Sequence, residues 1–134
     1  MTTVSKLMIK NIIVISPEKS VVDAANKMKK SGISSLIVTE NNQVRGIVTR
    51  SDLIDRVVAR GSDPRSITIE KIMTKKVLTI KPKANIVEAL RLMKLQKISQ
   101  LPVIEDGKLV GVVALRDALS YLAKFFLISG WRQE

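Results

Sequence analysis

The 134-residue sequence contains no cysteine and no histidine. Their absence excludes thiolate nucleophiles, histidine-based catalytic triads, disulfide bonds and zinc sites built from cysteine or histidine. No apolar run reaches the roughly 18–20 residues of a membrane span, and the first residues lack the pattern of a signal peptide. The expected location is therefore the cytoplasm, without membrane association.

Aromatic residues are scarce, and acidic residues are fewer than basic ones. The four aromatic residues, Tyr121, Phe125, Phe126 and Trp131, all lie near the C-terminus, so the rest of the chain lacks stacking platforms for single-stranded nucleic acid. The chain has 12 Asp and Glu against 23 Lys and Arg, which gives a net charge of +11. This excess is compatible with nucleic acid, anionic lipid or phosphorylated small molecules as partners.

An internal repeat is the main feature that the sequence does contain. Residues 6–58 match residues 71–123 at an offset of 65 without a gap. An internal repeat of this kind means that the fold consists of related structural units, so it is considered before any other feature. Two copies predict a closed pair related by a pseudo-twofold axis. We divide the chain into a first repeat (1–58), a connector (59–70), a second repeat (71–123) and a C-terminal aromatic tail (124–134).

Each copy shows the same order of elements. A β-rich run, at 12–15 or 77–80, stops before Pro17 or Pro82 and predicts a strand. It is followed by an amphipathic helix, two short strands joined by a turn, and a second helix. Gly32 predicts the end of the first helix in copy one, where copy two has Lys97. The order β-α-β-β-α predicts an α/β (α+β) fold in which each sheet packs against helices.

The layout and the motifs resemble the CBS (cystathionine β-synthase) domain. Residues 46–52 read Gly-Ile-Val-Thr-Arg-Ser-Asp in copy one, and residues 111–117 read Gly-Val-Val-Ala-Leu-Arg-Asp in copy two. The whole chain is similar to a stand-alone tandem CBS pair, or Bateman module. This resemblance implies two repeats packed through their sheets, with two clefts that bind adenosine ligands such as AMP, ADP, ATP or S-adenosylmethionine.

The resemblance assigns the motif of copy one to the first cleft, called cleft one. An aspartate at the start of a helix can accept both hydroxyls of a ribose, and hydroxyl groups beside a helix N-terminus favour a phosphate. The residues assigned to cleft one are Thr49, Ser51, Asp52, Ser34, Ser35, Met73, Lys75, Val77, Ile98 and Ser99.

Cleft two departs from the pattern, because Ala114 replaces the motif threonine and Arg116 replaces the motif serine. The first change removes a phosphate donor, whereas Arg116 can add a phosphate contact if its side chain points inward. We therefore expect the two clefts to differ in affinity or in ligand. The residues assigned to cleft two are Asp117, Arg116, Ala114, Met8, Lys10, Ile12, Ile33 and Gln100.

These residues also have a simpler interpretation. Asp52 and Asp117 can be acidic residues favoured by the helix dipole, and Thr49 and Ser51 can be ordinary capping groups. We favour the ligand role in cleft one and the capping role in cleft two. Most lysines and arginines fit solvated helix faces, while Lys10 and Lys75 occupy matched positions beside the clefts and are the best candidates for phosphate contacts.

The sequence thus predicts a regulatory module that senses an adenine nucleotide and signals to a separate partner protein. We expect no required cofactor, no metal site and no catalytic residue, because no motif couples a nucleophile to a base. The alternative function is a basic nucleic-acid-binding protein. The apolar segment 119–128 predicts packing against a second chain, as in a homodimer, or against the protein's own core, and we favour the homodimer.

Overall fold

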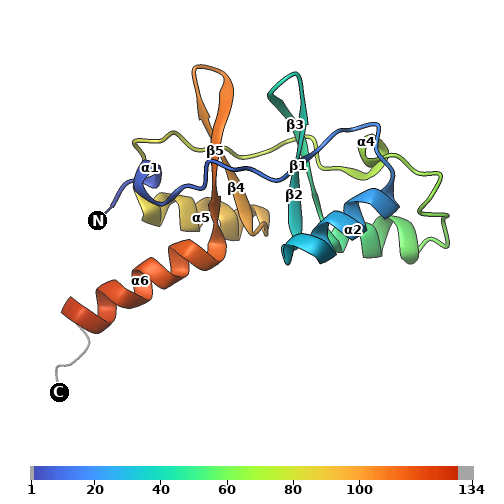
Figure 1. Ribbon diagram of the computed structural model, residues 1–134. Coiled ribbons are helices and arrows are strands. Elements are labelled where there is room, and N and C mark those ends of the chain that lie inside the picture. Colours follow the sequence, from blue (N-terminus) through green and yellow to red (C-terminus); the bar gives the residue numbers. More distant parts are fainter. Residues whose placement is uncertain (1, 130–134) are drawn as a thin grey trace.

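The computed structural model describes residues 2–129, in which the two copies form two α/β halves side by side (Figure 1). The first copy contains α1 (Val4–Leu7), β1 (Val14–Ile15), α2 (Val21–Ser31), β2 (Ser35–Glu40), β3 (Gln43–Thr49), α3 (Arg50–Leu53) and the π-helix η1 (Ile54–Val58). The second copy contains α4 (Ile69–Ile72), α5 (Ile86–Gln96), β4 (Gln100–Glu105), β5 (Lys108–Ala114) and α6 (Leu115–Ser129). The predicted mixed α/β fold of two related repeats is confirmed.

Each half is built around a small sheet. β2 pairs antiparallel with β3, and β1 pairs in parallel with the other edge of β2. In the second half β4 pairs antiparallel with β5, and the strand expected at 77–80 is reduced to one parallel bridge between Ile80 and Val103. Pro102 explains this difference, because it stands where copy one has Ile37, the partner of Val14, and it has no N–H to donate to the strand ladder. The Leu78 N–H donates instead to the Gln96 side chain (2.8 Å), which also donates to the Lys76 carbonyl (2.6 Å).

Helix α2 begins and ends where the sequence indicates. Ser20 and Asp23 form a capping box, in which the N–H of each residue donates to the side chain of the other. Gly32 ends the helix in the left-handed conformation, with φ of 67°. Lys97 ends α5 with a similar φ of 57°, so copy two makes the same turn without glycine.

The segment that leads into each copy crosses to the sheet of the other copy. Ile9 pairs with Val112 of β5, and Thr74 pairs with Ile47 of β3. Glycine is required at the crossings, because a Cβ atom on Gly46 would lie 2.7 Å from the sulfur of Met73. The hydrophobic cores also contain residues from the segment that leads into the other copy. Val4 belongs to the core of the second half, and Ile69, Ile72 and Met73 belong to the core of the first half.

Residues 124–129 of the predicted tail form the distal part of α6, which extends away from the two sheets (Figure 1). Its first turns pack on the protein's own core, where Ala118 is buried and the Tyr121 hydroxyl accepts a hydrogen bond from the Thr2 N–H (3.2 Å). Further along, Phe126 and Leu127 are 53% and 64% exposed. Packing on the protein's own core therefore accounts for only the first part of the segment, and Trp131 lies outside the described residues.

Candidate functional site

Two equivalent serines meet where the copies join. The hydroxyls of Ser34 and Ser99 lie 3.0 Å apart, and the buried Ser35 hydroxyl lies 2.9 Å from that of Ser99. The Ser34 carbonyl accepts a hydrogen bond from the N–H of Arg50, and the Ser99 carbonyl accepts one from the N–H of Leu115. Each serine turn is therefore tied to the first residue of α3 or α6, and all four chain segments are fixed near the pseudo-twofold axis.

A pocket of about 250 Å³, here called the cleft-two pocket, opens beside these serines. It is lined by Gly32, Ile33, Ser34, Arg50, Ser99, Gln100, Ala114 and Arg116. Four of the residues assigned to cleft two, Ile33, Gln100, Ala114 and Arg116, are thus brought together from both copies.

The other residues assigned to cleft two lie outside the lining of this pocket. The Met8 sulfur lies against Gly111, at 2.7 Å from the position of a Cβ atom there. Lys10 is exposed and Ile12 is half-buried in the crossing segment, while Asp117 is half-buried on the first turn of α6. Half of the residues assigned to cleft two therefore line one pocket, and the other half do not.

A second pocket, of about 560 Å³, shares Ser34 and Ser99 with the first. Its remaining lining residues are Leu90, Met93, Lys94, Lys97, Ile98, Leu115 and Leu119. Lys97, Ile98 and Leu115 are the repeat equivalents of Gly32, Ile33 and Arg50, so this pocket, here called the cleft-one pocket, shares part of its lining with the pseudo-symmetric counterpart of the cleft-two pocket. The counterparts Ser35, Thr49 and Ser51 do not line it. Among the residues assigned to cleft one, Ser34, Ile98 and Ser99 line it.

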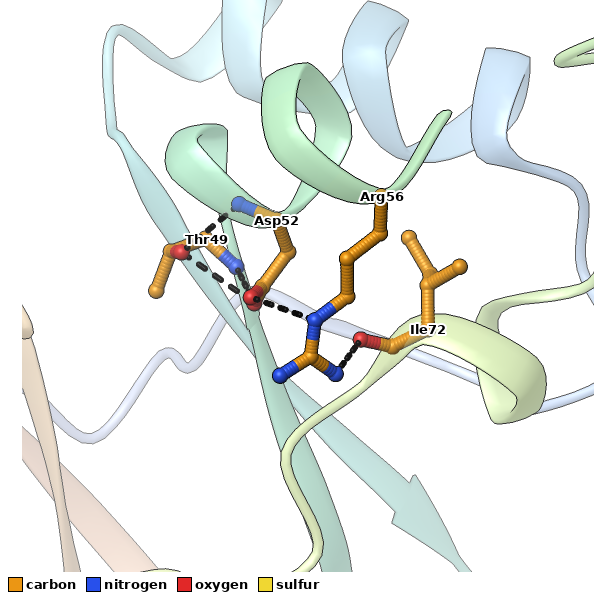
Figure 2. A network of polar contacts seen from close by, with 4 residues as sticks. All are labelled: Thr49, Asp52, Arg56 and Ile72. Carbon is orange, nitrogen blue, oxygen red and sulfur yellow. Dashed lines mark hydrogen bonds and ion pairs between the residues drawn. The ribbon is translucent and has the colours of Figure 1, made fainter. Parts of the chain in front are cut away.

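The Asp52 carboxylate is engaged at the start of α3 (Figure 2). Its Oδ2 accepts hydrogen bonds from the Thr49 N–H (2.8 Å) and the Thr49 hydroxyl (3.1 Å), and the Asp52 N–H donates to Thr49 Oγ1 (3.2 Å). On its other side Oδ1 lies 3.7 Å from Nε of Arg56, whose guanidinium donates to the Ile72 carbonyl (2.8 Å). Thr49 and Asp52 thus form the capping box that the simpler interpretation expects.

The remaining cleft-one residues differ in exposure. Ser51 is exposed on α3, next to Asp52. Met73 is buried against Gly46, while Lys75 is exposed and Val77 is half-buried in the segment that follows α4. None of these residues lines the cleft-one pocket.

Asp117 has a different environment from its equivalent Asp52. Ala114 stands where copy one has Thr49, and Tyr121 stands where copy one has Arg56, so both partners of the Asp52 carboxylate are missing. Within residues 2–129 no hydrogen bond or ion pair reaches the Asp117 carboxylate. The described residues therefore form no side-chain cap there, and Asp117 has only the position in the first turn of α6 that the helix dipole favours.

Arg50 lines the cleft-two pocket although the sequence analysis gave it no role. It lies between the motif threonine and serine, where its counterpart in copy two is Leu115. That difference between the copies is the sequence feature that marks it. Arg50 and Arg116 are both exposed, and neither guanidinium has a hydrogen bond or an ion pair in the described part of the chain.

Charged groups outside the clefts form local pairs. The backbone N–H of Arg65 lowers the pKa of Asp63 in the connector, and hydrogen bonds from Arg91 lower the pKa of Glu88 on α5. Residues 2–129 contain no cluster of three acidic side chains that could hold a metal ion. No helix in that range is both long and apolar enough to cross a lipid bilayer.

Comparison with known proteins identifies similar chains. The family model of the CBS domain matches residues 4–59 and 69–124. An uncharacterized protein of Methanopyrus kandleri is 37% identical over 112 residues, which are 82% of this chain and 57% of that protein. The inosine-5′-monophosphate dehydrogenase of Korarchaeum cryptofilum is 37% identical over 110 residues, which are 81% of this chain and 22% of that enzyme.

A solved structure matches over nearly its full length. A candidate signal-transduction protein with CBS domains from Burkholderia ambifaria is 27% identical, with a TM-score of 0.84 over 99% of this chain and 98% of that one. The two sequence relatives, in contrast, are longer than the matched region, and the chain spans little more than half of the first and less than a quarter of the second.

Proposed function

Because the chain belongs to the CBS-domain family and contains two CBS repeats, we propose that it is a regulatory module that binds an adenosine-containing ligand between the repeats and signals to a separate partner protein. The ligands under consideration are AMP, ADP, ATP and S-adenosylmethionine. The observation that carries the proposal is the cleft-two pocket, where Arg50 and Arg116 lie with Ser34 and Ser99 and no lining residue is acidic. Guanidinium and hydroxyl groups are common ligands of phosphate in proteins.

The regulatory part of the proposal follows from the shared lining of the pocket. Ser34 and Arg50 come from the first repeat, and Ser99 and Arg116 come from the second. A ligand that contacts both repeats stabilises one relative arrangement of them, provided that its affinity differs between arrangements. A partner protein that recognises one arrangement can then respond to the ligand.

In cleft one the same proposal requires the Asp52 carboxylate to exchange partners. Oδ1 faces Arg56, and the side chains of this ion pair are 13% and 43% exposed. The Oδ1–Nε distance of 3.7 Å is too long for a hydrogen bond, whereas a ribose hydroxyl can donate a hydrogen bond to this charged carboxylate, which contributes about 1.5–3 kcal/mol. The exchange of Arg56 for ribose hydroxyls is therefore favourable, and Thr49 can stay bonded to Oδ2 throughout.

The test is isothermal titration calorimetry with AMP, ATP and S-adenosylmethionine. Asp52→Ala and Asp117→Ala should each weaken binding of at least one of these ligands. Asp23→Ala is the matched control for Asp52→Ala, because it removes the equivalent capping box from α2, whose residues do not line either cleft pocket. Absence of binding heat with all three ligands would contradict the proposal.

The alternative of nucleic-acid binding rests on the net charge of +11. It predicts binding to DNA or RNA that weakens steeply as salt is raised. Such binding, found together with no heat from any adenosine ligand, would replace the first proposal with the second.

We extend the proposal to a homodimer. Leu119, Phe126 and Leu127 expose apolar surface on α6, and Ile54 and Val58 do so on the corresponding helical segment of the first copy. Exposed apolar surface of this kind favours association with another chain. A second copy of the protein is the occupant we propose.

The proposal is one of binding, not of catalysis. The groups in the clefts are hydroxyls, guanidiniums and carboxylates that can all serve as ligand contacts. No cofactor is required, and the nucleotide itself is the regulatory ligand. We place this activity in the cytoplasm, where adenine nucleotides are available.

A further inference from the structure

The two arginines of the cleft-two pocket point to a specific class of ligand. We infer that this pocket binds a chain of two or more phosphate groups, and that it discriminates against a monophosphate and against the cationic S-adenosylmethionine. This inference rests on the proposed function, because it concerns the same site. It is carried by Arg50 and Arg116, which enter one pocket from different copies.

Comparison of the two copies shows that the arginines are not a consequence of the repeat. The equivalent of Arg50 is Leu115, and the equivalent of Arg116 is Ser51. The two arginines occupy non-equivalent motif positions, yet both line the cleft-two pocket. The cleft-one pocket has the apolar Leu115 at the position equivalent to Arg50, so the fold does not require a guanidinium there.

The charges in the cleft-two pocket are uncompensated by the described residues. No acidic side chain lines the pocket, and neither guanidinium has an ion pair or a hydrogen bond within residues 2–129. Four other arginines have carboxylate partners within 4 Å, namely Arg45, Arg56, Arg65 and Arg91, whereas Arg60 in the connector has none within residues 2–129. Two like charges that share a pocket repel each other. An anion bound between them is attracted to both, and these two attractions offset the repulsion.

The size of the pocket fits part of a nucleotide. Sites that enclose a whole small molecule usually measure about 300–1,000 Å³, whereas this pocket measures about 250 Å³. A phosphate chain fills less space than a nucleoside with its phosphates. The nucleoside of a larger ligand would then extend out of the pocket.

The donors in the pocket match such a chain. Each guanidinium presents N–H groups in a planar fork, which suits two oxygens of one phosphate. Arg50 and Arg116 can therefore hold neighbouring phosphates, while the hydroxyls of Ser34 and Ser99 can donate to further oxygens. The positive sulfonium of S-adenosylmethionine would face two positive charges instead.

The experiment compares inorganic tripolyphosphate, orthophosphate, ATP, AMP and S-adenosylmethionine by calorimetry. We expect tripolyphosphate to bind and orthophosphate to bind at least tenfold more weakly. Arg50→Gln and Arg116→Gln should each weaken tripolyphosphate and ATP about tenfold and leave AMP within about twofold. Arg60→Gln is the control, because it removes the same charge from an exposed arginine of the connector that lines neither cleft pocket. Thermal unfolding establishes that each variant is folded.

The outcomes separate this inference from the proposed function. If an adenosine ligand binds but tripolyphosphate does not, or if Arg50→Gln and Arg116→Gln behave like Arg60→Gln, the inference is wrong and the proposed function stands. If tripolyphosphate binds through the two arginines and no adenosine ligand does, the proposed function is wrong and the inference stands for a polyphosphate without adenosine. If nothing binds, both are wrong.

Discussion

The hydroxyl of Ser34 lies 3.0 Å from that of Ser99, its own equivalent in the other copy. A residue can touch its repeat equivalent only near the axis that relates the copies, so these two atoms mark the pseudo-twofold axis. The contacts of the two serines are nevertheless not symmetric. The Ser99 hydroxyl also contacts that of Ser35, whereas Gln100, the equivalent of Ser35, has no hydroxyl to contact Ser34 in the same way. Ser99 is therefore the more connected member of the pair.

This asymmetry predicts unequal effects of removing the two hydroxyls. Ser99→Ala should destabilise the protein by about 1–2 kcal/mol, because it removes both hydroxyl contacts and leaves the buried Ser35 with a poorer partner. Ser34→Ala removes one contact and should cost about 0.5–1 kcal/mol. Urea unfolding measures both values, with the exposed Ser51→Ala as the neutral control. Equal losses for the two variants would contradict the proposed asymmetry.

A methyl group at the crossing glycines should be costly. The Cβ atom of Gly46→Ala would lie 2.7 Å from the Met73 sulfur and 2.8 Å from the Thr74 carbonyl oxygen, so a side chain and a backbone group must both move. We expect a loss of about 1–3 kcal/mol in the free energy of unfolding.

Gly111→Ala provides the comparison for this prediction. Its Cβ atom would lie 2.7 Å from the Met8 sulfur but 3.2 Å from the Ile9 carbonyl oxygen, so the flexible methionine can absorb more of the strain. The loss of unfolding free energy should be smaller than for Gly46→Ala. The reverse order would show that the two crossings are not packed as described.

Removal of Arg56 should strengthen, not weaken, the binding of an adenosine ligand in cleft one. The guanidinium of Arg56 lies against Oδ1 of Asp52, the oxygen that would accept a hydrogen bond from a ribose hydroxyl (Figure 2). Because the contact of Arg56 with Oδ1 is not a hydrogen bond and is worth on the order of 1 kcal/mol, Arg56→Gln should raise the affinity for AMP by up to about fivefold. Arg45→Gln serves as the control, since Arg45 pairs with Glu40 and Glu70, which line neither cleft pocket. Calorimetry that shows weaker AMP binding to Arg56→Gln would exclude the proposed exchange.

Polar substitutions on the distal part of α6 should shift the oligomeric state. Phe126→Ser and Leu127→Ser remove apolar surface that is 53% and 64% exposed, so they should weaken a dimer without loss of monomer stability. Size-exclusion chromatography with light scattering at micromolar concentration measures the change, with the exposed Lys124→Ser as the control. A wild-type protein that is already monomeric under these conditions would refute the dimer.

The local features of the fold could be predicted from the sequence. The 65-residue offset predicts the repeat, and Gly32 predicts a helix end, because glycine adopts the left-handed conformation without steric cost. The same helix end at Lys97 is predicted by the repeat and not by the residue type. The strand expected at 77–80 was only partly formed. Pro102 has no N–H to donate to this strand, whereas its equivalent in copy one, Ile37, pairs with Val14. The Leu78 N–H bonds to the side chain of the half-buried Gln96 instead, a contact that a pattern within the strand does not contain.

The candidate site could be predicted only in part, for a geometric reason. The serine turns and the motif residues come from short patterns, and the structure does bring Ser34, Ser99, Ala114 and Arg116 together. Arg50 was missed because its role depends on where the second copy lies. Whether a side chain enters a pocket between copies follows from their packing, which a pattern within one copy does not contain.

The crossing segments have a consequence for how the chain is made. Ile9 pairs with Val112, and the Val4 N–H donates to the Ala84 carbonyl, so residues that lead into the first copy find their partners among residues that are synthesised much later. Contacts between distant parts of a chain form slowly, because a long loop must close first. The N-terminal segment must therefore remain without its native partners until β5 has been synthesised, and the second half cannot complete its core during translation of the first.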